Sequence, residues 1–279
     1  MAQVFMRFPG GKNKTLTFSY DDGVEQDVRL ISIFEKNGLK ATFNLNSGLY
    51  AEEGYRYPEG QIHRRMSASE VSALYAKDWI EVAVHGATHP WLSYMPVNMI
   101  TADLLDDRRN LERQFGRIVR GMAYPYGDYS DEVVACMASS GIVYSRTVIS
   151  THDFDMPRDW MRLPATCHHD DPELMTLARR FVDEDTYGRP RMFYLWGHSY
   201  EFEEHDNWNV IEEFTEFMAG RDDIWYATNI EIYDYQDAFN RLLFSTDGSL
   251  VHNPSGIKLW FATEDGEFSV EPGATIKTR

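Results

Sequence analysis

Over the first two-thirds of the chain, strand-like and helix-like patterns alternate, and this alternation restricts the fold more than any other feature. A β-rich run over residues 14–20 is followed by residues 24–37, whose apolar side chains recur at helical spacing. The same order then returns several times. Repeated β-α units predict an α/β fold with a parallel sheet covered by helices. With this many units we expect a distorted β/α barrel, closed or nearly closed, rather than an open sheet.

The predicted barrel ends near residue 243, where the character of the sequence changes. Beyond it, Asp-Gly pairs separate short alternating runs, which predicts a small β-rich appendage, residues 244–279, packed on a barrel formed by residues 1–243. Residues 152–172 are interpreted as a long polar loop, and loops of that length in compact domains are often functional. The predicted strands cover residues 14–20, 41–46, 79–84, 121–124, 142–147, 191–196 and 224–227, and the predicted helices cover residues 24–37, 67–77, 98–115, 130–140, 207–219 and 231–243.

The excess of acidic residues limits the partners that we expect, and other features of the sequence indicate the compartment. The 44 acidic and 27 basic residues give a net charge of −17, and so negative a surface repels phosphate backbones, so we expect no nucleic-acid partner. No run of about 18 uncharged apolar residues exists, so no membrane span is expected. Residues 1–10 lack the apolar core of a secretory signal, and Cys136 and Cys167 are too few for a disulfide framework. These features favour a cytoplasmic protein and leave its oligomeric state open.

Two motifs at predicted strand ends indicate a metal site. Asp21 and Asp22 follow the first strand. Because adjacent carboxylates repel each other, their site must supply a compensating positive charge, and a divalent cation is the strongest one available. His85 and His89 follow the strand over 79–84 as a His-x-x-x-His motif. Since the C-terminal ends of barrel strands meet at one rim, one Asp and two His can surround a metal while the second Asp remains for chemistry.

Two further strand ends carry Tyr124-Pro125-Tyr126-Gly127 and Leu195-Trp196-Gly197-His198. Taken in order with Ser19-Tyr20-Asp21-Asp22-Gly23 and His85-Gly86-Ala87-Thr88-His89, they resemble the motifs of the polysaccharide deacetylase family, the NodB-homology group also called carbohydrate esterase family four. The resemblance covers roughly residues 14–230. It implies a metal-dependent hydrolase that removes an N-acetyl or similar acyl group from a carbohydrate or a carbohydrate-like substrate.

The resemblance also implies roles for individual positions. Asp22, His85 and His89 would hold one divalent metal, most simply zinc, although cobalt, nickel and manganese also suit this ligand set. Asp21 would be the general base that takes a proton from the attacking water, and His198 the general acid that protonates the leaving amine.

The same resemblance describes the surroundings of the reacting carbonyl. The backbone N–H of Tyr126 would stabilise the oxyanion, with Tyr124 and Pro125 in the same turn. Leu195 and Trp196 would wall an apolar pocket for the acetyl methyl group.

The sequence departs from the family pattern at two places. The third motif usually brings an Arg that orients the base, but Ala123 stands at that position. We expect Arg146, at the end of the next strand, to bring its guanidinium fork to Asp21 instead; otherwise it forms a salt bridge on the rim. The Asp-Trp pair of the fourth motif survives only as a displaced Asp159-Trp160, to which no role is assigned.

Simpler explanations exist for each motif, and other functions stay open. An Asp-Asp-Gly can be only a turn, and two histidines near a strand end can be hydrogen-bonded in a loop. The segment Cys167-His168-His169-Asp170-Asp171 could be a second metal site, or a loop at the cleft in which His168 or His169 contacts substrate. The alternative functions are an amidohydrolase acting on a small cytosolic non-sugar amide and a catalytically silent carbohydrate-binding barrel.

Overall fold

The computed structural model describes residues 3–279, so the first two residues of the predicted barrel unit lie outside the described part. Its main sheet has nine strands, all paired in parallel, in the order β7-β6-β5-β4-β3-β2-β9-β8, with β10 beside β2. The predicted α/β fold is therefore confirmed. The strands are β2 (Lys14–Asp21), β3 (Ala41–Leu45), β4 (Ile80–Val84), β5 (Gly121–Ala123), β6 (Tyr144–Ser150), β7 (Leu163–Ala165), β8 (Cys167–His168), β9 (Arg191–Gly197) and β10 (Ile224–Tyr226).

The two ends of this sheet meet in one short segment. β7 pairs with β6, and after Thr166 the chain continues as β8, which pairs with β9. The N–H of Thr166 itself donates to the carbonyl oxygen of Tyr194 at 2.9 Å. The segment 163–168 thus bridges both ends of the path, in the manner of a distorted barrel. It also corrects the prediction of a polar loop over 152–172, because the loop patterning hid two strands too short to show a period.

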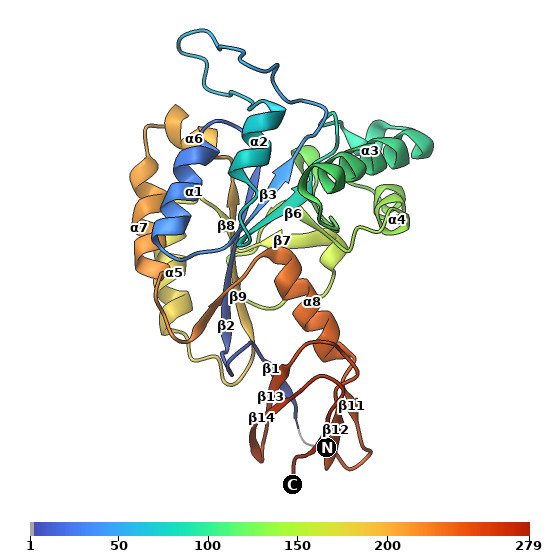
Figure 1. Ribbon diagram of the computed structural model, residues 1–279. Coiled ribbons are helices and arrows are strands. Elements are labelled where there is room, and N and C mark those ends of the chain that lie inside the picture. The colour runs from blue at the N-terminus through green and yellow to red at the C-terminus, as the bar shows by residue number, and fades with distance from the viewer. Residues whose placement is uncertain (1–2) are drawn as a thin grey trace.

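Helices cover the outer face of the sheet, with α1, α5 and α7 on one side and α3 and α4 on the other (Figure 1). Serine and threonine caps set several helix starts: Ser67 and Glu70 form a capping box at α2, and Thr228 and Glu231 form one at α8. Val28 was expected on the apolar stripe of the predicted helix 24–37, but it is 56% exposed, so the buried stripe of α1 is shorter than predicted. The helices are α1 (Asp27–Lys36), α2 (Ala68–Leu74), α3 (Val97–Phe115), α4 (Asp131–Ser139), α5 (Leu174–Asp183), α6 (Ser199–Glu204), α7 (Trp208–Met218) and α8 (Asn229–Asn240), with short 3-10 turns at Leu92–Tyr94, Pro125–Gly127 and Trp160–Arg162.

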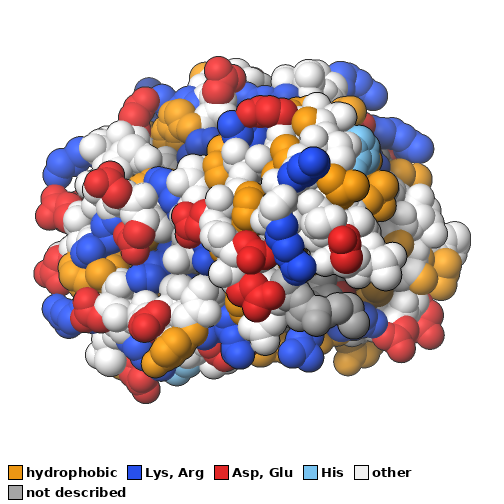
Figure 2. All heavy atoms as spheres, turned by 90° about the horizontal axis from the view of Figure 1, so that it is seen from below, with side chains coloured by type: hydrophobic (Ala, Val, Ile, Leu, Met, Phe, Trp, Pro, Cys, Tyr) orange, Lys and Arg blue, Asp and Glu red, His pale blue; other side chains and the backbone are white. Residues whose placement is uncertain are grey.

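The C-terminal segment forms two small antiparallel sheets at the end of the barrel where β2 begins (Figure 1). One of them includes β1 (Phe5–Arg7) from the start of the chain, paired with β13. Apolar side chains of both chain ends, Phe8 and Phe261 among them, pack in one cluster with Tyr235 of α8. On this face, acidic and basic side chains are interspersed (Figure 2). The remaining strands are β11 (Leu243–Phe244), β12 (Leu250–His252), β13 (Leu259–Thr263), β14 (Gly266–Val270) and β15 (Thr275–Lys277).

Among the described residues, no helix combines the length and the apolarity that crossing a membrane would require.

Candidate active site

The candidate site lies where β2, β4, β5, β6 and β9 end, at the rim opposite the appendage. Asp21 is the last residue of β2, and Asp22 follows with φ at 85°, a left-handed conformation that Asp tolerates better than most residues. The next residue, Gly23, also has a positive φ of 67°. This sharp turn leaves both carboxylates at the end of β2 and buries them, with exposed fractions of 2% and 7%.

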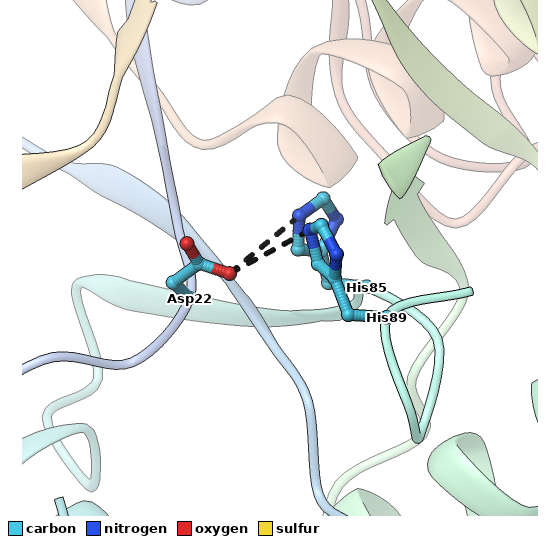
Figure 3. A group of neighbouring side chains, drawn as sticks. All are labelled: Asp22, His85 and His89. Atoms are coloured by element: carbon cyan, nitrogen blue, oxygen red, sulfur yellow. Dashed lines mark ion pairs between the residues drawn. The ribbon is translucent and has the colours of Figure 1, made fainter. Parts of the chain in front are cut away.

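Asp22, His85 and His89 converge as the sequence predicts for a metal site (Figure 3). Oδ1 of Asp22 lies 4.0 Å from Nε2 of His85 and 3.8 Å from Nε2 of His89. These separations are too long for hydrogen bonds, so the two ring nitrogens face one carboxylate oxygen without bonding to it. One ion among these three atoms would draw them together by a few tenths of an ångström, since zinc binds His nitrogen and carboxylate oxygen at about 2.0–2.2 Å.

The protonation state of both histidines suits a cation. Nδ1 of His85 lies 2.7 Å from the carbonyl oxygen of Ala123, so this nitrogen carries the proton and Nε2 offers its lone pair to the site. Burial lowers the pKa of His85, and burial together with the neighbouring His85 lowers the pKa of His89 to about 4. Both imidazoles are therefore uncharged near neutral pH, which is the form that binds metals. The donor set fits a divalent ion.

Two buried carboxylates of α3 hold the His85–His89 turn in place. Asp107 accepts the N–H of His85 at 3.1 Å, and Asp103 accepts the N–H of Ala87 at 2.9 Å and the hydroxyl of Thr88 at 2.8 Å. Burial raises the pKa of Asp107 to about 7. The turn that carries the two imidazoles is thus fixed by side chains one layer behind it.

Asp21 is clamped between two donors. One oxygen accepts a hydrogen bond from Nδ2 of Asn44 at 2.8 Å, and the other accepts from the guanidinium of Arg146. Arg146 is 1% exposed and lies over the ring of Trp196 at 4.1 Å. Burial would raise the pKa of Asp21, but the charges of Arg146, His85 and His198 together outweigh it, so the pKa lies below its ordinary value and the carboxylate is ionised.

Arg146 stands directly beside Ala123, the position that holds Arg in the family pattern. The two residues are cross-strand partners between β5 and β6. The guanidinium therefore approaches Asp21 from the neighbouring strand at the same height.

Asp22 also has partners that the sequence did not indicate. The guanidinium of Arg65 donates to Oδ1 at 2.9 Å, and Nε2 of His63 lies 3.3 Å from Oδ2. Burial would raise the pKa of Asp22, but these contacts hold it well below its ordinary value. Both residues come from the loop between β3 and α2, which lacks any periodic pattern. Nothing in the sequence places that loop over the site.

His198 lies at the end of β9 between two carboxylates. Its Nε2 is 3.8 Å from Oδ2 of Asp21, and its Nδ1 is 3.2 Å from Oε1 of Glu201. Burial would lower the pKa of His198, but Glu201 and Asp21 outweigh it and raise the pKa to about 9. The imidazole is therefore protonated near neutral pH, as a proton donor must be. The sequence did not indicate a role for Glu201; its spacing of three residues from His198 was the available signal.

The absence of a side chain at Gly197 leaves room for the ring of His169. A Cβ at position 197 would lie 2.1 Å from Nδ1 of His169, whose ring is fully buried and stacked on Phe202 at 4.0 Å. We expect Gly197→Ala to lower the free energy of unfolding by roughly 1–3 kcal/mol through overpacking. Urea unfolding of Gly197→Ala would measure this. Gly256→Ala is the matched control, because its Cβ would meet nothing within 4 Å; an equal loss in both variants would contradict the expectation.

The other predicted residues surround the site at different distances. Tyr126 has a φ of 59° and its ring contacts that of His89 at 4.4 Å. Tyr124 is buried and donates to the carbonyl oxygen of Met161 at 2.7 Å, away from the two aspartates. Pro125 is buried near Gly86. Trp196 lies in the interior cluster, whereas Leu195 points to the opposite, helix-facing cluster.

Two further segments were left without a firm role by the sequence. Asp159 caps a 3-10 turn and pairs with Arg162 at 2.8 Å, so it does not face His198. In the 167–171 segment, Nε2 of His168 lies 3.2 Å from Glu201, and Nε2 of His169 lies 3.3 Å from the same carboxylate. These groups gather around Glu201, and the thiol of Cys167 is buried outside the cluster.

Comparison with known proteins assigns the family. The family model described as polysaccharide deacetylase matches residues 9–145, about half of the chain. The chain belongs to the polysaccharide deacetylase family. Among curated proteins, no sequence matches it.

One solved structure supports the same fold, and two further structures align more weakly. A putative polysaccharide deacetylase from Mycobacterium smegmatis aligns with a TM-score of 0.59 at 14% identity, over 86% of this chain and 96% of that one. A family 4 carbohydrate esterase from Streptomyces lividans aligns with a TM-score of 0.48 at 13% identity, over 74% and 88%. A Streptococcus pyogenes deacetylase aligns with a TM-score of 0.42 at 21% identity over 47% of this chain, which spans only 55% of that protein. The first of these alignments shows that the α/β fold is of the type that the motifs predicted.

Proposed function

We propose that the chain is a metal-dependent deacetylase that hydrolyses an N-acetyl or similar amide on a carbohydrate. The convergence of Asp22, His85 and His89 beside the clamped carboxylate of Asp21 carries this proposal. These three ligands would hold one divalent ion, zinc by ligand type. Such an ion, when bound, polarises the amide carbonyl and lowers the pKa of water.

The residues of the chain itself divide the proton transfers between them. Asp21 is ionised and fixed by Arg146 and Asn44, so it accepts the proton of the attacking water. His198 carries a proton and lies 3.8 Å from Asp21, so it donates to the departing nitrogen. The N–H of Tyr126 would stabilise the negative oxygen that develops between these steps.

Metal content and turnover, measured together, test this proposal. Wild-type protein loaded with zinc should retain one equivalent after desalting and deacetylate N-acetylated sugars from a panel that also contains small amides. Asp22→Ala and His89→Ala should lose both the metal and the activity, whereas Asp106→Asn, on the exposed face of α3, should keep both. Hydrolysis of small amides alone would support the amidohydrolase instead. Metal binding without any turnover would indicate a silent barrel.

The acid role of His198 predicts a pH dependence. Because the folded pKa of His198 is raised to about 9, the protonated donor is present below that pH and is lost as the pH rises through it. Glu201→Gln removes a charge that sustains this pKa, so the alkaline limb of kcat/KM should move to lower pH. The pH profile of Glu204→Gln, an exposed neighbour on α6, should match wild type. An unmoved limb in Glu201→Gln would remove Glu201 from the mechanism.

A further inference from the structure

Three imidazole rings, those of His168, His169 and His198, surround the carboxylate of Glu201. His168 reaches it from the segment that joins the two ends of the sheet, because β8 pairs its Cα with that of Trp196 in β9. Nε2 of His168 lies 3.2 Å from Oε2 of Glu201, and Nδ1 of His198 lies 3.2 Å from Oε1. The two carboxylate oxygens therefore face imidazoles from the ends of two different strands.

A hydrogen bond determines which ring nitrogen of His168 carries the proton. The backbone N–H of Asp170 donates to Nδ1 of His168 at 3.2 Å. A nitrogen that accepts a hydrogen bond carries no proton, so the proton of this imidazole is on Nε2, the atom that faces Glu201. His168 is therefore an uncharged donor toward the carboxylate, and its Nε2 has no lone pair to offer a metal ion.

Donors hold the carboxylate of Glu201 in one orientation. The backbone N–H of His198 donates to Oε2 at 3.0 Å. Burial would raise the pKa of Glu201, but hydrogen bonds from His168 and His198 outweigh it and hold the pKa well below its ordinary value. The side chain of Glu201 is only 18% exposed, so water can replace little of what these donors supply.

The ring of His168 is itself held in place. It meets the ring of Trp196 edge to face at 4.6 Å, and its side chain is 23% exposed. Trp196 in turn lies under the guanidinium of Arg146, at 4.1 Å. This packing, together with the bond from Asp170, keeps Nε2 of His168 beside Glu201.

We propose that His168 is a positioning residue for the proton donor of the reaction: it holds the carboxylate of Glu201 in the orientation that fixes the ring of His198. This inference rests on the proposed function, in which His198 protonates the departing nitrogen. The contacts run from the N–H of Asp170 through His168 and Glu201 to His198, whose Nε2 lies 3.8 Å from Oδ2 of Asp21. The segment that closes the barrel thereby takes part in the acid step without contacting the substrate.

Other titratable groups also surround His198 and Glu201, and the experiments leave them unchanged. Any effect therefore arises from His168 or Glu201. The groups are Tyr20 within β2, Asp21 and Asp22 at the end of β2, His169 and Asp170 after β8, and Tyr200 of α6.

Steady-state kinetics with N-acetylglucosamine as the probe test this role by separating kcat from KM. His168→Leu removes the donor, so kcat should fall by roughly tenfold, which is part of what a general acid contributes, while KM stays near its wild-type value. His168→Gln places an amide N–H near the position of Nε2 and should recover most of kcat. His205→Leu is the control and should behave as wild type, because the imidazole of His205 contacts Asp170 at 2.9 Å rather than Glu201. A raised KM with an unchanged kcat in His168→Leu would make His168 a substrate contact and overturn the positioning role.

A double-mutant cycle tests whether His168 acts through Glu201. His168→Leu alone should move the alkaline limb of kcat/KM to lower pH, in the direction expected for Glu201→Gln. Added to Glu201→Gln, it should cause no further loss of kcat and no further movement of the limb, because the charged carboxylate that His168 positions is already absent. Losses that multiply in the double variant would show that His168 acts independently and would overturn the proposal.

A measurement without turnover separates this inference from the proposed function. The pKa of His198 can be followed by NMR of protein with isotope-labelled histidine, in which the ring signals of His198 are assigned by their absence in His198→Gln. His168→Leu should lower this pKa, and His168→Gln should leave it near the wild-type value. An unchanged pKa in His168→Leu overturns the positioning role, whatever the activity. A lowered pKa, in a protein whose wild type deacetylates no sugar, would support the positioning role and overturn the deacetylase.

Discussion

Replacing Asp21 with Asn is expected to lower kcat/KM by roughly 10²–10⁴-fold, the usual contribution of a general base. Asn keeps the shape of the side chain but cannot accept the proton of the attacking water. Because Asp22, His85 and His89 are untouched, the variant should still bind one equivalent of zinc. Steady-state kinetics together with metal analysis of the same preparation would measure both effects.

A suitable control for this variant is Asp159→Asn. Asp159 is also paired with an arginine, Arg162, but lies away from His198 and the metal ligands. We expect it to retain wild-type rates. Asp21→Asn with an unchanged rate would assign the proton transfer to another group, and loss of metal in that variant would place Asp21 among the ligands.

Removing the Arg146 guanidinium should produce the largest loss of stability. Arg146→Met leaves the carboxylate of Asp21 buried without its cation, and breaking a buried pair on one side costs about 3–5 kcal/mol. Urea unfolding would measure the loss. The pKa of Asp21 should also rise, because Arg146 supplies the largest of the charges that oppose the effect of burial.

A double variant separates the stability lost through the unpaired charge of Asp21 from the stability lost through packing of Arg146. If the unpaired charge causes the loss, Asp21→Asn/Arg146→Met should recover most of the stability, since replacing both partners of a buried pair is often neutral. Arg120→Met is the control: its pair with Asp234 is about one-third exposed, so it should cost no more than about 1 kcal/mol. A double variant as unstable as Arg146→Met alone would show that packing on Trp196 dominates.

The fold and the convergence of the proposed metal ligands could be predicted from the sequence because both depend on strand ends. Apolar runs followed by turn residues identify β2, β3, β4 and β9. Parallel strands bring their C-terminal ends to one rim, independently of the conformation of the loops. Asp22, His85 and His89 each follow such an end by only a few residues. Their convergence therefore follows from the topology.

The residues that contact these groups could not be predicted, because they do not lie at strand ends. Arg65 and His63 sit in a long loop whose path over Asp22 depends on tertiary contacts, such as the pair between Arg64 and Glu203 at 2.8 Å. Asn44 lies within a strand and looks like any strand residue. Asp103 and Asp107 occupy positions on α3 that would suit a solvated face, yet both point inward. β7 and β8 are too short to show a period.

The cross-strand placement of Ala123 and Arg146 has a consequence for how relatives of this chain are classified. A screen that requires arginine within the third motif would discard this sequence as inactive. Because Ala123 and Arg146 are paired on neighbouring strands, an arginine at either position is anchored next to the same place, and here Arg146 brings its charge to Asp21. For such sequences a three-dimensional criterion, the distance from any guanidinium to the carboxylate at the end of β2, is the sounder test.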